Sequence, residues 1–201
     1  MFVSFEGLDG SGKTTQAELL AESLTKDGRE VVTTREPGGT PLGERVRELL
    51  LEGEPMSAWA EAALFAAARA ELVERVIGPK LAGGADVVSD RFLDSSLVYQ
   101  GAARGLGIER VLALNLDPIR GILPDVTFLL LIGVDEALKR SAGARDRIEQ
   151  EGEAFMSLVD NGYRQLAGLF PQRIVAIQAD RPMHDIAEEV REHVRQRAGA
   201  S

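Results

Sequence analysis

The sequence predicts an α/β fold in which a five-stranded parallel sheet is flanked by helices on both faces. Five short apolar segments recur along the chain, at residues 2–5, 31–34, 86–89, 126–132 and 174–177, and helical patterns separate them. This alternation of strand and helix signals is typical of a parallel sheet. The fourth segment is apolar almost throughout, so we expect a central strand that is covered on both faces.

The segments between the strands predict helices in the same order. Apolar side chains recur at helical spacing over 17–24, which predicts a first helix that stops near Gly28. Ser57 is a typical N-cap residue, so we expect a long helix over 57–81 that is interrupted near Pro79. Further helices are expected at about 42–51, 94–103, 108–118, 134–141, 153–170 and 183–197.

Composition excludes several classes of function. The 201 residues suit a single domain, 1–201, and 44% hydrophobic residues suffice for a core. No apolar stretch approaches the roughly 18 residues of a membrane span, and no basic leader precedes the first strand, so we expect a cytoplasmic protein without a membrane partner. The net charge of -9 disfavours binding to a nucleic-acid polymer. The absence of cysteine excludes disulfides and cysteine zinc sites.

A phosphate-binding loop directly follows the first predicted strand. The sequence GLDGSGKT at residues 7–14 fits the pattern G-x-x-x-x-G-K-[ST], in which glycines let backbone N–H groups surround a phosphate. In this pattern Lys13 reaches the β and γ phosphates, and the hydroxyl of Thr14 helps to hold Mg²⁺. The expected strand before the loop and helix after it are the context that the motif requires, so we predict a site for a nucleoside triphosphate.

The loop alone does not distinguish a kinase from a nucleotide-dependent switch. A GTPase switch would carry an N/T-K-x-D motif late in the chain. The nearest sequence, TKD at residues 25–27, has the wrong spacing and lies in the first predicted helix. The switch is therefore the less favoured alternative, and it predicts slow hydrolysis without a phosphorylated acceptor.

Three charged segments predict a second, anionic substrate. TREPGGT and DRFLDSSLVYQG follow the second and third predicted strands, and RSAGARDRIEQE lies between two predicted helices. Ligands of open parallel sheets bind beyond the carboxyl ends of the strands, so these segments are expected to meet in one cleft. Asp90 ends its strand where an acid that holds Mg²⁺ is expected, and Arg35 and Arg91 are suited to fork onto phosphate oxygens.

Asp9 is unusual because a carboxylate inside a polyphosphate-binding loop repels the ligand unless it has a partner of its own. It is either a turn residue, or an acceptor for a hydroxyl of the second substrate, or a group that steadies a lysine or a metal ion. The residues alone leave these alternatives open.

Together these segments resemble the thymidylate kinase family, whose members phosphorylate dTMP with ATP. EGLDGSGKTTQ, REPGGT, FAAARAELV, DRFLDSSLVYQG, PDVTFLL and DRIEQE occur in the family's order and spacing, so the resemblance covers essentially the whole chain. It implies a P-loop NTPase fold of the nucleoside monophosphate kinase type, transfer of the ATP γ-phosphoryl group to dTMP in dTTP biosynthesis, and a homodimer. Another P-loop small-molecule or nucleoside monophosphate kinase is the nearest alternative.

The resemblance also implies roles for individual residues. Phe65 would stack on thymine, Arg69 would donate to a thymine oxygen, Arg35 and Arg91 would hold the dTMP phosphate, and Asp9 would bind the 3′-hydroxyl. The implied dTMP site is completed by Glu36, by Ser96 and Gln100 beside the base, and by Tyr99 against the sugar. The implied ATP site consists of Gly7, Asp9, Gly10, Ser11, Gly12, Lys13, Thr14, Thr15 and Arg145, with Mg²⁺ held by Thr14 and Asp90.

A small lid is implied at about 141–151. The phosphate loop carries no arginine, which resembles the bacterial subtype in which lid arginines cancel charge on the transferred group. We expect Arg147 to make the more direct contact and Arg145 to be second. The expected catalytic residues are Lys13, Arg147, Asp9 and Arg91.

One departure from the family pattern lies at the end of the fourth strand. Many relatives have an acidic residue there, whereas this chain has Leu131, Ile132 and Gly133. A carboxylate role at this position is therefore in doubt, with Asp135 as a candidate replacement.

The Ala-rich face of the helix over 57–81 would let two subunits approach closely.

Overall fold

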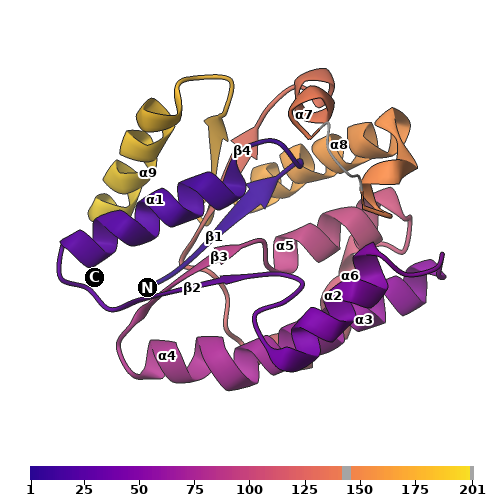
Figure 1. Ribbon diagram of the computed structural model, residues 1–201, viewed down its shortest axis with the longest axis horizontal. Coiled ribbons are helices and arrows are strands. Elements are labelled where there is room, and N and C mark those ends of the chain that lie inside the picture. The colour runs from indigo at the N-terminus through magenta and orange to yellow at the C-terminus, as the bar shows by residue number, and fades with distance from the viewer. Residues whose placement is uncertain (142–145, 200–201) are drawn as a thin grey trace.

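A five-stranded, all-parallel sheet forms the centre of the computed structural model, which describes residues 1–141 and 146–199 (Figure 1). The strands lie in the order β2-β3-β1-β4-β5. They are β1 (Phe2–Gly7), β2 (Val31–Arg35), β3 (Asp86–Asp90), β4 (Val126–Leu131) and β5 (Ile174–Gln178). Strand β4 lies inside the sheet and is buried at all six positions, which confirms the prediction from its apolar sequence.

The helices follow the predicted order. They are α1 (Lys13–Lys26), α2 (Pro41–Leu51), α3 (Ala58–Leu72), α4 (Gly78–Ala82), α5 (Leu93–Ser96), α6 (Ile108–Ile119), α7 (Val134–Arg140), α8 (Glu153–Leu169) and α9 (Met183–Ala198). Ser57 caps α3 as predicted, because its side chain accepts a hydrogen bond from the backbone N–H of Ala60. No helix within the described residues is long and apolar enough to cross a membrane.

The long helix differs from the prediction in one respect. A π-helical segment, η1 (Val73–Ile77), joins α3 to α4 without a break, and Pro79 lies at the start of α4. Proline cannot donate the N–H that a continuous helix bonds to the preceding turn, and the wider π-helical turns of η1 lie directly before Pro79, where the regular α-helical bonding changes. A second π-helical segment, η2 (Leu97–Ala103), extends α5 over the remainder of the helix predicted at 94–103.

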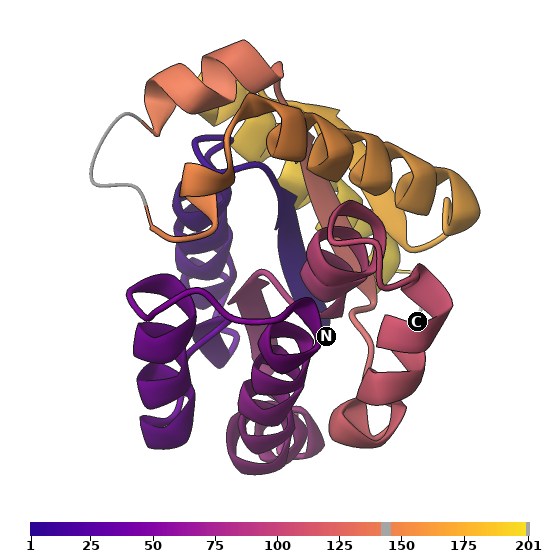
Figure 2. The same cartoon turned by 90° about the vertical axis from the view of Figure 1, so that its right-hand side faces the viewer.

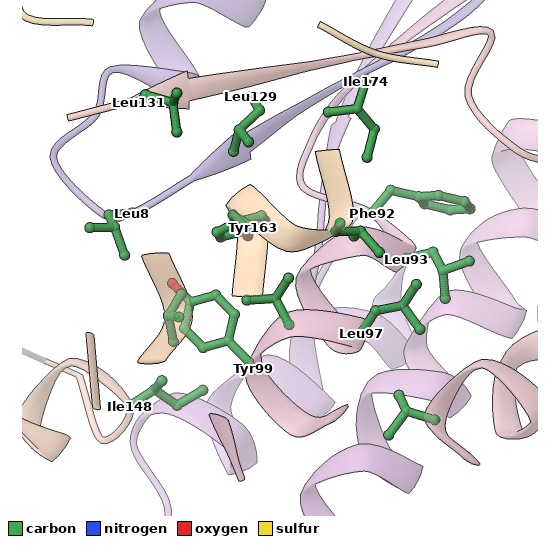
Figure 3. Close-up of a cluster of buried hydrophobic side chains, with 14 of the residues drawn as sticks. Leu8, Phe92, Leu93, Leu97, Tyr99, Leu129, Leu131, Ile148, Tyr163 and Ile174 are labelled. Atoms are coloured by element: carbon green, nitrogen blue, oxygen red, sulfur yellow. The ribbon is translucent and has the colours of Figure 1, made fainter. Parts of the chain in front are cut away.

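Helices cover both faces of the sheet. Alternate side chains of β1 point to opposite faces, so Val3 and Phe5 pack with α1 and α9, whereas Phe2 packs with the segments on the other side. Figure 3 shows part of the cluster on that second side, including Phe92 and Tyr163. Helices α2 and α3 lie side by side beyond it and share a smaller cluster (Figure 2).

The carboxyl ends of three neighbouring strands meet at one edge of the sheet. Asp90 of β3 pairs with Phe5 of β1 on one side and with Arg35 of β2 on the other. Two backbone hydrogen bonds extend this register, from Arg91 to Phe5 and from Glu36 to Asp90, each 2.9 Å long. The charged segments that follow these strands are therefore held together, as the sequence predicts.

Candidate active site

The phosphate-binding loop leaves β1 and turns into α1. Gly7 and Gly10 have φ angles of 136° and 79°, and a Cβ atom at Gly10 would lie 2.7 Å from the carbonyl oxygen of Ala137. Glycine is required at Gly10 because both the backbone conformation and the close approach of α7 exclude a side chain. The buried ammonium of Lys13 donates to the carbonyl oxygen of Leu8 at 2.9 Å, so the lysine lies over the loop.

The carboxylate of Asp9 lies between two cations. It accepts a hydrogen bond from Arg91 at 2.6 Å and another from Lys13 at 3.3 Å. Burial alone would raise the pKa of Asp9, but the charges of Arg91 and Lys13 outweigh it and hold this pKa well below its usual range. Asp9 therefore steadies the lysine, which was one of the alternatives, while its contact with a sugar hydroxyl stays a prediction.

Thr14 and Asp90 lie together where the sequence predicts a magnesium site. The hydroxyl of Thr14 donates to Oδ2 of Asp90 at 2.5 Å. Both residues line a cavity of about 760 Å³. Within the described residues, no cluster of three or more His, Cys, Asp or Glu side chains could hold a metal ion by itself. Two oxygen ligands suit Mg²⁺, which takes few protein groups and completes its shell with phosphate oxygens and water.

This larger cavity, here called the phosphate cavity, runs from the phosphate-binding loop to the ends of β2 and β3. Arg35 lines it with a side chain that is 55% exposed and pairs with Glu44 at 3.0 Å. Of the predicted residues, those that line it are Asp9, Gly10, Gly12, Lys13, Thr14, Thr15, Arg35, Glu36, Asp90 and Arg91. Gly7 and Ser11 belong to the loop but lie outside this lining.

A smaller cavity of about 90 Å³, here called the base pocket, adjoins the phosphate cavity. Asp9, Glu36, Arg47 and Arg91 line both cavities. Three residues of the predicted dTMP site, Phe65, Tyr99 and Gln100, also line the base pocket. The structure therefore brings the predicted aromatic residues next to the predicted phosphate-binding arginine.

Arg69 and Ser96 lie outside the lining of the base pocket. Arg69 is 1% exposed, and its guanidinium pairs with Glu36 at 2.5 Å and donates to Ser96 at 3.0 Å and to Asn115 at 2.5 Å. Burial raises the pKa of Glu36 despite the attraction of Arg69. Arg69 thus holds Glu36, which lines the pocket, and its contact with a thymine oxygen stays a prediction.

A buried carboxylate lies beneath Arg91. Glu6 accepts hydrogen bonds from the hydroxyls of Ser95 at 2.5 Å and Tyr163 at 2.8 Å, and Arg91 donates to the same two hydroxyls at 3.1 Å. Burial, assisted by the nearby charge of Asp94, raises the pKa of Glu6 to about 7. The network connects the sheet to the guanidinium that faces both cavities.

The predicted lid is described only in part. Residues 142–145 lie outside the described residues, so the structure does not place Arg145. Arg147 donates from Nη2 to Glu61 at 2.6 Å and from Nε to the carbonyl oxygen of Leu50 at 2.9 Å. Arg147 is absent from the lining of the phosphate cavity, so its contact with a transferred phosphoryl group stays a prediction.

Sequence reasoning missed several residues that shape the site. Glu61 and Asn115 are buried and hydrogen-bond to predicted site residues, and buried Glu6 reaches Arg91 through the hydroxyls of Ser95 and Tyr163, yet none of the three belongs to the predicted set. The available signal was an acidic residue within an apolar strand or on a buried helix face. Leu131, at the end of β4, is buried in the core, and Asp135 lies in the first turn of α7 outside both cavity linings.

Comparison with known proteins agrees with this geometry. The family model described as thymidylate kinase matches residues 5–190. A thymidylate kinase of Caldanaerobacter subterraneus subsp. tengcongensis is 48% identical over 88% of this chain and 86% of its own length. One from a Synechococcus species is 49% identical over 93% and 90%. The crystal structure of thymidylate kinase from Ehrlichia chaffeensis superposes with a TM-score of 0.79 at 34% identity, over 97% of this chain and 98% of that one. The chain therefore belongs to the thymidylate kinase family.

Proposed function

We propose that this protein transfers the γ-phosphoryl group of ATP to dTMP and so forms dTDP for dTTP biosynthesis. The observation that carries the proposal is the meeting of the two cavities at Asp9 and Arg91. The phosphate cavity contains the loop that suits a triphosphate, and the base pocket contains Phe65 and Tyr99, which suit a nucleobase. Two nucleotides bound in this way would present their phosphates to each other beside Arg91. Membership of the thymidylate kinase family supports the same pair of substrates.

The proposed reaction requires alignment and charge neutralisation. The attacking phosphate oxygen of dTMP is already anionic, so no covalent enzyme intermediate and no strong base are needed. Lys13 lies in the loop where it would contact the β and γ phosphates, and Arg91 would hold the acceptor phosphate. Thr14 and Asp90 would hold Mg²⁺, which, when bound, neutralises charge on the phosphate oxygens.

The decisive experiment measures ATP consumption with Mg²⁺ in the presence and absence of dTMP and identifies the product. We expect rapid formation of dTDP that AMP and dCMP do not match. Selection against dUMP should be modest, because one methyl group in an apolar pocket is worth only about 1 to 3 kcal/mol. A different phosphorylated acceptor would support another small-molecule kinase, and slow hydrolysis of ATP without any acceptor would support a switch.

We also propose that segment 141–151 acts as a lid and that Arg147 leaves Glu61 to neutralise charge when the lid closes. Arg147→Ala should then lower kcat by about 10²-fold or more, with little change in the KM for dTMP. Steady-state kinetics tests this expectation. A raised KM for dTMP at an unchanged kcat would instead assign Arg147 to the wall of the base pocket.

A homodimer is the assembly that we propose. Ala60, Ala63 and Ala67 are exposed along α3, and such small side chains allow two helices to approach closely, while Trp59 adds an exposed aromatic ring. Leu49 of the adjacent α2 is exposed as well. Sedimentation should give twice the chain mass of 21.7 kDa, and a value equal to one chain would contradict the proposal.

Because both proposed substrates are cytoplasmic nucleotides, we place the reaction in the cytoplasm.

A further inference from the structure

Glu61 is a buried acid that pairs with Arg147 before the proposed closure of the lid and that also contacts the wall of the base pocket. It lies in the first turn of α3 and is 1% exposed. Its carboxylate accepts hydrogen bonds from three residues that lie far away in the sequence. These are Gln100 at 2.9 Å, Arg104 at 3.2 Å and Arg147 at 2.6 Å.

The charge state of Glu61 follows from these partners. Burial disfavours ionisation, but the hydrogen bonds from Gln100, Arg104 and Arg147 outweigh it and lower the pKa of Glu61 below its ordinary value. An ionised carboxylate has no proton to donate, so every group that faces it must be a donor.

This restriction sets the orientation of the Gln100 side chain. A glutamine amide has a donor end and an acceptor end of nearly equal shape, so only its partners decide which end points where. Nε2 of Gln100 must face Glu61, since the reverse orientation would place a carbonyl oxygen against a carboxylate. Gln100 lines the base pocket, which leaves its acceptor, Oε1, as the end that is available to a ligand there.

An acceptor in this place distinguishes pyrimidine bases. Where Oε1 faces ring atom N3 of the base, thymine and uracil can donate the hydrogen on N3 to it. N3 of cytosine is an acceptor with no hydrogen to donate, since the donor of cytosine is the amino group on C4. We propose that Glu61 is a positioning residue that fixes the acceptor end of Gln100 toward the base pocket, so that the pocket selects pyrimidines with an N3–H group and rejects cytosine. This inference rests on the proposed function, because it assigns the base pocket to the acceptor nucleotide.

The experiment compares Glu61→Gln with the wild type by measuring kcat/KM for dTMP and for dCMP. In the variant, the new amide can present either end, so Gln100 is free to turn over. We expect the ratio of the two kcat/KM values to fall by about tenfold or more, with a higher KM for dTMP and a lower KM for dCMP. Calorimetric titration of both nucleotides into wild type and variant should show the same change in relative affinity.

Glu151→Gln provides a matched control. Glu151 also accepts a hydrogen bond from Arg104, at 2.5 Å, and within the part of the chain that the structure describes it makes no hydrogen bond to Gln100. This variant should weaken the same arginine network and leave the dTMP to dCMP ratio at its wild-type value. Equal losses for dTMP and dCMP in Glu61→Gln would overturn the proposal, because a purely structural role of Glu61 predicts them.

A second variant keeps the proposal testable if Glu61→Gln does not fold. Gln100→Met removes both ends of the amide and leaves the two arginine pairs of Glu61 in place. It should also lower the dTMP to dCMP ratio by about tenfold, and an unchanged ratio would overturn the proposal. Failure of the wild-type protein to phosphorylate dTMP would reject the proposed function, whereas an active wild type with an unchanged ratio in these variants would reject only the inference about Glu61.

Discussion

The phosphate cavity and the base pocket are built in different ways. The phosphate cavity is large and is formed mainly by consecutive residues of one loop and by the ends of two strands, with exposed side chains such as Arg35. The base pocket is small, and buried ion pairs between distant segments, such as Arg69 with Glu36, support its walls. The loop of the phosphate cavity thus depends on local backbone geometry. Asp90 and Arg91 in that cavity, and the walls of the base pocket, depend on contacts between distant segments.

Replacement of Lys13 should have the largest effect, a loss of activity. This effect should be confined to the phosphate cavity. Lys13→Ala removes a positive charge placed at the phosphates, so kcat should fall by about 10²- to 10³-fold. The affinity for dTMP should change only a few-fold, because Lys13 does not line the base pocket. Steady-state kinetics and dTMP titration would separate the two effects. Equal losses of rate and dTMP affinity would show that the two cavities are not independent.

Replacement of Glu36 should have the next largest effect and should weaken folding and the base pocket together. Glu36→Gln leaves the charge of buried Arg69 without its ion-pair partner, which we expect to lower the free energy of unfolding by about 3 kcal/mol. Urea denaturation measures this change, and titration should show weaker binding of dTMP.

Glu71→Gln is the control for this variant. Glu71 pairs with the exposed Arg75, so this substitution in α3 should change stability by less than about 1 kcal/mol. Equal destabilisation by both substitutions would mean that the buried pair contributes no more to the free energy of unfolding than the exposed pair. This result would contradict the contrast between the two cavities.

Replacement of Glu6 should have the smallest effect. This effect is a change in how the free energy of unfolding depends on pH. Because folding raises the pKa of this carboxyl from 4.5 to about 7, the folded state keeps a proton that the unfolded state has lost between these values. The contribution of Glu6 to stability therefore falls as pH rises from about 4.5 and is at its lowest above about 7. Relative to Glu6→Gln, the wild type should lose about 1 kcal/mol or more between pH 5 and 8 in urea denaturation. Parallel stability curves would contradict this prediction.

Much of the fold could be predicted because its signals are local. The strand and helix order follows from apolar spacing, and the cap of α3 follows from Ser57 alone. The continuous passage through η1 could not be predicted. Proline near a helix end predicts an interruption, whereas in the structure the helix continues through the π-helical turns of η1 into α4, which contains Pro79.

The candidate site divides in the same way. The sequence by itself determined the phosphate-binding loop and the Thr14 and Asp90 pair, since these depend on one motif and on parallel strand ends, whereas it left the partner of Asp9 open. Only the tertiary structure decided that Arg69 pairs with Glu36, that Arg147 lies on Glu61, and that Glu61 orients Gln100. The physical reason is that a buried charge requires an oppositely charged or hydrogen-bonding partner, and the fold decides which residue lies close enough to serve. Because the two residues are separated by tens of positions in the sequence, no local pattern predicts which residue this will be.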